Sequence, residues 1–186
     1  MAATPTIQIP LGYTAPDFNL LDTTSNTFKS LDELKGEKAT VIMFICNHCP
    51  YVKHVNKQLV QLANDYIPNG ISFIAISSND VENYPDDAPD KMSIVAKEEN
   101  YPFPYLYDET QDIAKAYQAA CTPDFSIFDK DLKCIYRGQL DDSRPKNDSI
   151  ADGKDIRNVL ECLLNNQEIP STQIPSLGCN IKWKPA

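Results

Sequence analysis

Residues Phe44–His54, FICNHCPYVKH, contain the change of pattern that decides the fold. They continue Ala39–Ile45, an unbroken run of apolar and β-branched residues, which is typical of a strand covered on both faces. From Val52 to Tyr66, apolar residues instead recur at steps of three and four, the pattern of an amphipathic helix. The segment therefore predicts a strand that leads through Cys46 and Cys49 into a helix.

The rest of the chain continues this alternation. Ile71–Ser77 is again strand-like and completes a β-α-β unit, which favours a right-handed crossover between parallel strands. Further strands are expected at 18–20, 103–106, 125–128 and 134–137, and further helices at 31–34, 89–100, 112–119 and 154–165. We therefore expect an α/β protein with a central mixed β-sheet flanked by helices.

The length of 186 residues suits one domain. We expect a single domain over residues 1–186, with its core at about 12–164, an N-terminal extension, and a C-terminal tail over 165–186. From Ile169 onward the tail has no clear periodicity, and no helix or strand is predicted there.

Charge and composition limit the classes of partner and the cellular location that we expect. The formal net charge of −9 argues against nucleic acid and anionic membranes, because both are polyanions. The N-terminal residues lack a signal-peptide pattern, and no apolar run approaches the ~20 residues that a membrane helix needs. We expect a soluble, cytoplasmic protein. In that compartment, six cysteines indicate reactive, metal-binding or buried thiols rather than a disulfide framework.

Cys46 and Cys49 stand at a strand-to-helix junction, two residues apart, which is the spacing of a redox pair. Pro50 fits the first turn of the helix. The helix N-terminus carries about half a positive charge and stabilises a thiolate. A protonated His48 would add a positive charge beside the pair and favour thiolate further. No second closely spaced Cys/His pair follows, so a four-ligand structural zinc site is not favoured.

Several segments together resemble the alkyl hydroperoxide reductase/thiol-specific antioxidant (AhpC/TSA, peroxiredoxin-like) branch of the thioredoxin superfamily. They are APDFNL at 15–20, the strand at 39–45 and CNHCP at 46–50. More specifically, FICNHCPYVKH at 44–54, CTPDFSIFD at 121–129, YRGQLDDSRP at 136–145 and LGCNIKW at 177–183 together resemble an uncharacterised peroxiredoxin-like group of thioredoxin-family proteins with a CNHCP motif. The resemblance covers roughly residues 12–164 and implies a thioredoxin fold. It also implies that Thr122 and Pro123 form a cis-proline loop that faces the cysteine pair and offers its backbone to an extended partner chain.

Two assignments of the pair compete within this superfamily. If the pair works as in thioredoxins, Cys46 is the nucleophile and Cys49 is the resolving thiol that releases the partner from the mixed disulfide. By peroxiredoxin logic Cys49 is the peroxidatic thiol, but Cys46 then replaces that pattern's threonine and Pro123 stands where its arginine is expected. Arg137 could supply a cation from the neighbouring strand. We therefore expect a thiol–disulfide oxidoreductase, with a thiol peroxidase of antioxidant function as the alternative.

The remaining cysteines leave one further alternative open. Cys121 and Cys179 are candidates for additional redox thiols, because Cys121 precedes the expected cis-proline and a C-terminal cysteine could fold back. Cys134 and Cys162 fit small buried hydrophobes. A non-enzymatic alternative is a soft-metal carrier that holds Cu(I) or Zn(II) with Cys46, Cys49, Cys121 and His48.

For the leading function we expect no cofactor and no resident metal. The expected partners are protein or small-molecule disulfides, hydroperoxides in the peroxidase alternative, and a reducing thiol system. Neither nucleic acid nor a membrane is expected as a partner.

Overall fold

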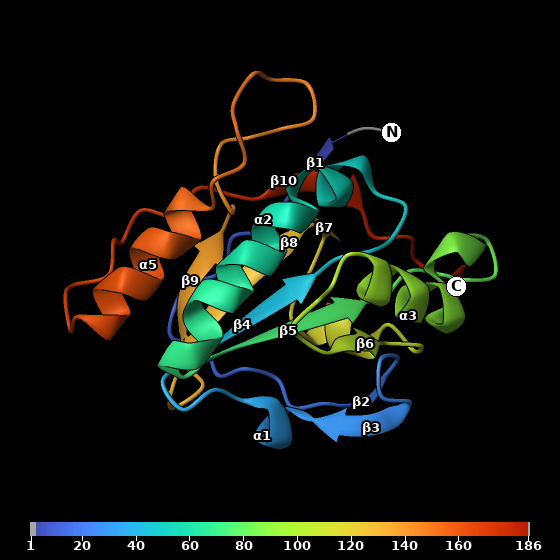
Figure 1. Cartoon of the computed structure of the whole chain (residues 1–186), viewed down its shortest axis with the longest axis horizontal. Helices are drawn as coiled ribbons and strands as arrows, with labels where there is room; N and C mark the ends of the chain where they lie inside the picture. Colours follow the sequence, from blue (N-terminus) through green and yellow to red (C-terminus); the bar gives the residue numbers. More distant parts are fainter. Residues whose placement is uncertain (1–2, 186) are drawn as a thin grey trace.

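The computed structural model describes residues 3–185, and a seven-stranded mixed sheet lies at its centre (Figure 1). The strand order is β3-β2-β6-β5-β4-β8-β9, in which β4–β5 and β5–β6 are parallel and the other neighbours antiparallel. The strands are β2 (Asn19–Asp22), β3 (Thr27–Ser30), β4 (Ala39–Phe44), β5 (Ile71–Ser77), β6 (Tyr105–Tyr107), β8 (Asp124–Asp129) and β9 (Cys134–Gly138). The predicted mixed sheet is confirmed.

Helices cover both faces of this sheet, and each face has its own apolar core. One core contains residues of three helices: α2 (Pro50–Tyr66), α3 (Pro89–Glu98) and α5 (Lys154–Leu164). The other core contains residues of two short helices: α1 (Leu31–Leu34) and α4 (Asp112–Ala116). In Figure 1, α2 and α5 lie on the same side of the sheet.

The position of β4 explains the unbroken apolar run in the sequence. All six residues of β4 are buried. Val41 and Met43 belong to the core under α2, whereas Ile42 and Phe44 belong to the core on the opposite face. Because successive side chains of a strand point to opposite faces, a strand with two covered faces needs apolar residues at every position.

Local signals define several helix ends. At α1, Ser30 and Glu33 form a capping box, in which the Ser30 side chain accepts from the Glu33 N–H and the Glu33 carboxylate accepts from the Ser30 N–H. The chain leaves α2 through the short 3₁₀ helix η1 (Ile67–Asn69), and Gly70 then adopts a left-handed conformation with φ of 86°.

A second, three-stranded antiparallel sheet consists of strands that the sequence did not reveal. Its order is β1-β10-β7, with β1 (Ala3–Pro5), β10 (Leu177–Asn180) and β7 (Cys121–Thr122). Figure 1 shows β1 and β10, from opposite ends of the chain, side by side above the main sheet. The C-terminal tail, predicted without regular structure, thus contributes the middle strand of this sheet.

The segment between β5 and α3 also differs from the sequence prediction. The sequence predicts neither a helix nor a strand between the strand at 71–77 and the helix at 89–100, but the structure has the 3₁₀ helix η2 (Pro85–Asp87) there, and the Asp87 side chain is fully buried. Among residues 3–185, no helix is long and apolar enough to cross a membrane.

Candidate active site

Cys46 and Cys49 lie where β4 gives way to α2, as the sequence predicts. Cys49 is the N-cap residue of α2 and Pro50 occupies the first turn. The thiol of Cys49 therefore lies at the positive end of the helix, where backbone N–H groups lack intrahelical partners. Both cysteines are free thiols, and both are buried, with 2% of Cys46 and none of Cys49 exposed. Both thiols are therefore shielded from solvent in the structure.

Thr122 contacts both sulfur atoms. Its peptide bond to Pro123 is cis, as the resemblance implies. The Thr122 hydroxyl lies 3.4 Å from Cys46 Sγ, and Cys49 Sγ donates to the Thr122 carbonyl oxygen over 3.2 Å. One residue thus offers a donor to the sulfur of Cys46 and an acceptor to the sulfur of Cys49.

The two thiols titrate as a pair. A hydrogen bond from the Cys46 thiol, the largest contribution, lowers the pKa of Cys49 to about 5, and contacts with Cys179, Thr122 and the backbone of Val52 lower it further. Donating this proton raises the pKa of Cys46, as do its burial and the charge of Asp87. The reduced pair therefore holds one proton and one negative charge at neutral pH.

Asp87 is a site residue that the sequence analysis missed. Its carboxylate accepts hydrogen bonds from His48 Nδ1 at 2.6 Å, Asn79 Nδ2 at 2.8 Å and the backbone N–H of Asn47 at 2.8 Å. Burial opposes ionisation of this carboxyl, but these hydrogen bonds lower its pKa below the usual value. The Asp87 hydrogen bond in turn raises the pKa of His48. His48 and Asp87 thus form a largely buried ion pair, and His48 itself stands inside the cysteine motif, next to Cys49.

His48 therefore acts differently from the lone cation expected from the sequence. Its Nδ1 atom lies 4.0 Å from Cys46 Sγ, but the same nitrogen is bound to Asp87. The negative charge of the Asp87 carboxylate offsets the positive charge of the His48 imidazolium. The His48 ring stacks on Tyr84 at 5.5 Å, and its buried Nε2 atom has no hydrogen-bond partner among the described residues. The ring is held firmly beside Cys46.

A polar groove of about 470 Å³ begins at His48 and runs between α2 and α3. Lys53 of α2 and Lys91 and Glu98 of α3 line it. The groove adjoins the cysteine motif at Asn47 and His48, and its lining carries both positive and negative side chains.

The family follows from comparison with known proteins. The AhpC/TSA family matches residues 11–137. This chain belongs to the AhpC/TSA family. At the level of the family it is therefore a thiol oxidoreductase, and the resemblance noted in the sequence is confirmed.

The chain is also similar to solved structures. An uncharacterised conserved protein from Geobacillus kaustophilus is 59% identical with a TM-score of 0.98, over 100% of this chain and 98% of that chain. A hypothetical protein from Sinorhizobium meliloti 1021 is 39% identical with a TM-score of 0.95, over 98% and 100%. The thioredoxin domain of a thiol-disulfide oxidoreductase from Bacteroides vulgatus, 17% identical with a TM-score of 0.58 over 70% and 89%, shares the thioredoxin fold. No curated protein matches.

The arginine that an AhpC/TSA peroxidase pattern calls for is not supplied by Arg137. Its guanidinium is buried and donates to the carbonyl oxygens of Ile7 and Gln118 and to the hydroxyl of Ser126. It also lies 3.7 Å from the buried carboxylate of Asp124. These partners occupy the guanidinium, so Arg137 of β9 joins β8 to the segments around Ile7 and Gln118.

The two additional thiol candidates of this AhpC/TSA chain face opposite ways. Cys179 lies opposite Thr122 in the pairing of β10 with β7, and its thiol interacts with Cys49. Cys121 precedes Thr122 and points to the other face of β7. Its sulfur lies 3.8 Å from the hydroxyl of Thr6 and donates to the carbonyl oxygen of Pro123, and burial raises its pKa. The structure thus brings Cys179, and not the thiol of Cys121, to the pair.

Cys134 and Cys162 lie away from the pair. Cys134 is buried in the core on the opposite face of the sheet, where burial raises its pKa to about 11. Cys162 lies on α5 and is half-buried.

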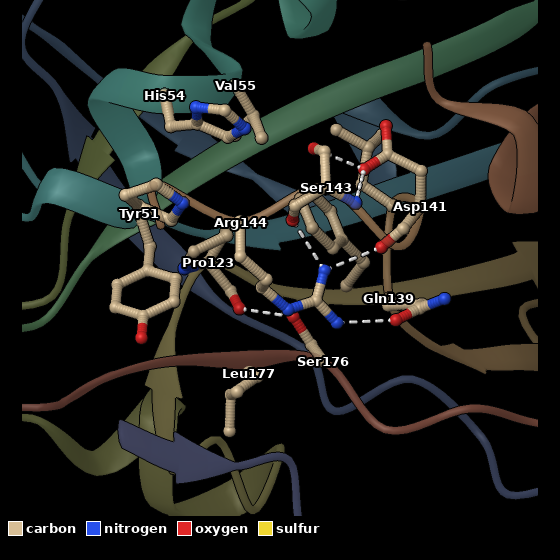
Figure 2. Close-up of a pocket in the computed structure, with 13 residues that line it drawn as sticks. Tyr51, His54, Val55, Pro123, Gln139, Asp141, Ser143, Arg144, Ser176 and Leu177 are labelled. Carbon is tan, nitrogen blue, oxygen red and sulfur yellow. Dashed lines mark hydrogen bonds between the residues drawn. The ribbon is translucent and has the colours of Figure 1, made fainter. Parts of the chain in front are cut away.

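A second pocket lies on the other side of the cis-proline loop (Figure 2). Figure 2 shows Arg144 at its centre, and the guanidinium donates to the carbonyl oxygens of Asp141 and Ser143 and to the side chain of Gln139. The pocket is too small for a substrate, and its cation is bound internally. His54 also lines this pocket and is half-buried.

One cluster has donor atoms for a metal ion. The ligand atoms of Cys46, His48 and Asp87 lie within 4.8 Å of one another. Sulfur, nitrogen and oxygen donors suit Zn(II). However, His48 Nδ1 and Asp87 already bind each other, so an ion would have to break the buried ion pair. Of the ligands expected for a soft-metal carrier, Cys121 points away from this cluster.

Proposed function

We propose that this chain is a thiol–disulfide oxidoreductase that cycles Cys46 and Cys49 between dithiol and disulfide. The observation that carries the proposal is the double contact of Thr122 with the pair. Its hydroxyl can donate to a Cys46 thiolate while its carbonyl oxygen accepts the proton of the Cys49 thiol. Thr122 therefore supports Cys46 as the nucleophile when the shared proton lies on Cys49, which is the minor position of that proton in the reduced pair because the pKa of Cys49 is the lower of the two.

The reaction follows from two positions of one proton. With the proton on Cys49, the Cys46 thiolate attacks a disulfide, forms a mixed disulfide and expels the first half of the substrate as a thiolate. With Cys46 so consumed, Cys49 loses its proton readily at the helix N-terminus. Its thiolate attacks Cys46 Sγ, the Cys46–Cys49 disulfide forms, and the second half leaves as a thiolate. The substrate gains the two electrons that the pair loses.

Small-molecule disulfides fit this site better than extended polypeptides. In the expectation from the resemblance, the backbone of the cis-proline loop is open to a partner chain. Here β10 pairs with that backbone, with Cys179 opposite Thr122 and Asn180 opposite Cys121. A polypeptide would have to displace β10. A small disulfide can instead enter from the groove beside His48, which adjoins the cysteine motif at Asn47 and His48.

A second candidate function, reduction of hydroperoxides, is favoured by the low pKa of Cys49. A thiolate is the species that attacks peroxides. In this reaction Cys49 attacks the peroxide, the O–O bond breaks to give Cys49 sulfenic acid and an alcohol or water, and Cys46 displaces water to form the disulfide. The bound state of Arg137 weighs against this candidate, because no activating cation contacts Cys49 among residues 3–185.

Single cysteine variants distinguish the two functions. We would measure the turnover of a small disulfide and of hydrogen peroxide, with a thiol reductant supplied, in Cys46→Ser, Cys49→Ser and the control Cys134→Ser. For the proposed function, Cys46→Ser abolishes disulfide turnover and the wild type consumes peroxide negligibly. Peroxide turnover that is lost in Cys49→Ser and only slowed in Cys46→Ser would establish the second candidate instead.

A further inference from the structure

The C-terminal strand β10 brings a third cysteine to the pair. Cys179 and Thr122 are direct partners in the antiparallel pairing of β10 with β7, and directly opposed side chains lie on the same face of a sheet. The Thr122 side chain faces the pair, since its hydroxyl lies 3.4 Å from Cys46 Sγ. Cys179 therefore faces the pair as well. It is 3% exposed and belongs to the same apolar core as Cys46 and Cys49.

The approach of β10 to the cis-proline loop is unusually close. At Gly178, a Cβ atom would lie 2.0 Å from the Thr122 carbonyl oxygen and 3.0 Å from the Pro123 nitrogen. That carbonyl oxygen is the acceptor for the Cys49 thiol. A glycine beside Cys179 thus lets the strand lie directly against the backbone that contacts Cys49.

The strand is also fixed at both ends. Before it, the Ser176 hydroxyl donates to the Pro123 carbonyl oxygen over 2.7 Å. After it, the Lys182 N–H donates to the Asn79 side chain over 2.8 Å, and Asn79 in turn donates to Asp87. Cys179 is therefore held against the pair by the same network that holds His48.

We propose that Cys179 is a third redox thiol of this site, placed by β10 to attack Cys49 in the Cys46–Cys49 disulfide. This proposal rests on the proposed function, which supplies that disulfide. Cys179 loses its proton to solvent and its thiolate attacks Cys49 Sγ. The Cys49–Cys179 bond forms, the Cys46–Cys49 bond breaks, and Cys46 Sγ leaves with the electron pair and takes up a proton. The number of oxidised sulfurs is unchanged.

The electrostatics of Cys179 change in the direction that this step needs. In the reduced protein, burial is the largest cause that raises the pKa of Cys179 to about 12, and the neighbouring Cys49 thiolate raises it further. Once Cys49 is part of a disulfide, its charge is gone and that contribution disappears. Lys182, whose charge lowers the pKa of Cys179, remains. Oxidation of the pair therefore shifts the pKa of Cys179 downward from its value in the reduced protein, although burial still raises it.

The exchange would have a definite consequence for the oxidised protein. Cys46, the nucleophile of the proposed function, returns to the free thiol. The oxidising equivalent moves to β10 and links the C-terminal strand covalently to the start of α2. Reduction of the protein then requires an attack on Cys49 or Cys179.

The test is a map of disulfides in the oxidised full-length chain. The protein is oxidised with diamide, free thiols are alkylated, and peptides are identified by mass spectrometry without reduction. We expect cross-linked peptides for both Cys46–Cys49 and Cys49–Cys179 in the wild type, with alkylated Cys46 in the second form. In Cys46→Ala, only Cys49–Cys179 forms. In Cys179→Ala, the Cys49–Cys179 peptide and the alkylated Cys46 of the oxidised protein are both lost.

The control Cys134→Ala, which removes a buried thiol from the other core, keeps the wild-type pattern. A Cys46–Cys49 disulfide in the wild type with no Cys49–Cys179 peptide in wild type or in Cys46→Ala overturns this proposal and leaves the proposed function standing. Absence of the Cys46–Cys49 disulfide from both wild type and Cys179→Ala overturns the proposed function itself. Because the wild type and Cys46→Ala are informative on their own, the test does not depend on the folding of Cys179→Ala.

Discussion

The hydrogen bond between the two thiols can be tested with a matched pair of variants at Cys46. Cys46→Ala removes the donor that contributes most to the low pKa of Cys49, whereas Cys46→Ser keeps a hydroxyl that can donate from the same position. Without the donor, the pKa of Cys49 should move from about 5 toward the ordinary thiol value of 9.0. With the hydroxyl, much of the depression should remain.

The size of the effect decides which quantity to measure. Such a rise in pKa lowers the thiolate fraction at pH 7 from about 99% to about 1%, a factor of roughly 100. The more basic thiolate is also the better nucleophile, and over about four pKa units this raises its intrinsic rate by roughly 40- to 100-fold. The two effects nearly cancel. The reaction rate at pH 7 is therefore a poor readout, and the midpoint of the pH–rate profile is the quantity that moves.

The assay is the reaction of each variant with a small dithiodipyridine disulfide between about pH 4 and pH 10, with each cysteine identified afterwards by mass spectrometry. Half-buried Cys162 serves as the internal reference. We expect an acidic midpoint for the wild-type pair, an intermediate one for Cys49 in Cys46→Ser, and one near the ordinary thiol value in Cys46→Ala. Equal midpoints for Cys49 in the wild type and Cys46→Ala would refute the hydrogen-bond argument and leave the helix N-terminus as the cause.

Three further predictions concern the surroundings of the pair. Asp87→Asn should destabilise the protein by about 1.5–3 kcal/mol, the range for a charge-assisted hydrogen bond. Because Asp87 raises the pKa of His48 and its own pKa is lowered, this loss should be largest between about pH 5 and 6 and shrink as pH rises through the raised pKa of His48; urea denaturation across pH checks this, and a pH-independent loss contradicts it. Gly178→Ala should cost about 1–3 kcal/mol by overpacking against Thr122 and should speed alkylation of Cys49, whereas the exposed control Ser171→Ala should do neither. Arg137→Met should lower the free energy of unfolding by about 3–5 kcal/mol, because it leaves Asp124 buried without its partner. It should leave the pH midpoint of Cys49 unchanged, and a raised midpoint would show that Arg137 stabilises the Cys49 thiolate.

The sequence by itself determined the main sheet and the place of the cysteine pair. Ala39–Ile45 has the unbroken apolar pattern that a doubly covered strand requires, and the helix after Cys49 has its own periodicity of three and four. These signals are local, since each depends on neighbours within a few residues. Cys46, Cys49 and Pro50 follow at the junction of the two patterns, and the motif around Thr122 was recognisable from its resemblance to AhpC/TSA sequences.

Only the tertiary structure decided what surrounds the pair. Asp87 lies forty residues from Asn47, in a segment whose Pro, Asn and Asp content resembles any solvated loop, and only the fold buries its carboxylate against His48. β10 has no periodicity of its own, because its conformation is imposed by pairing with β1 on one side and β7 on the other. Cys121 and Cys179 are equally plausible neighbours of the pair in the sequence. The alternation of faces along β7, together with the register of β10, brings Cys179 to Cys49 and turns Cys121 toward Thr6.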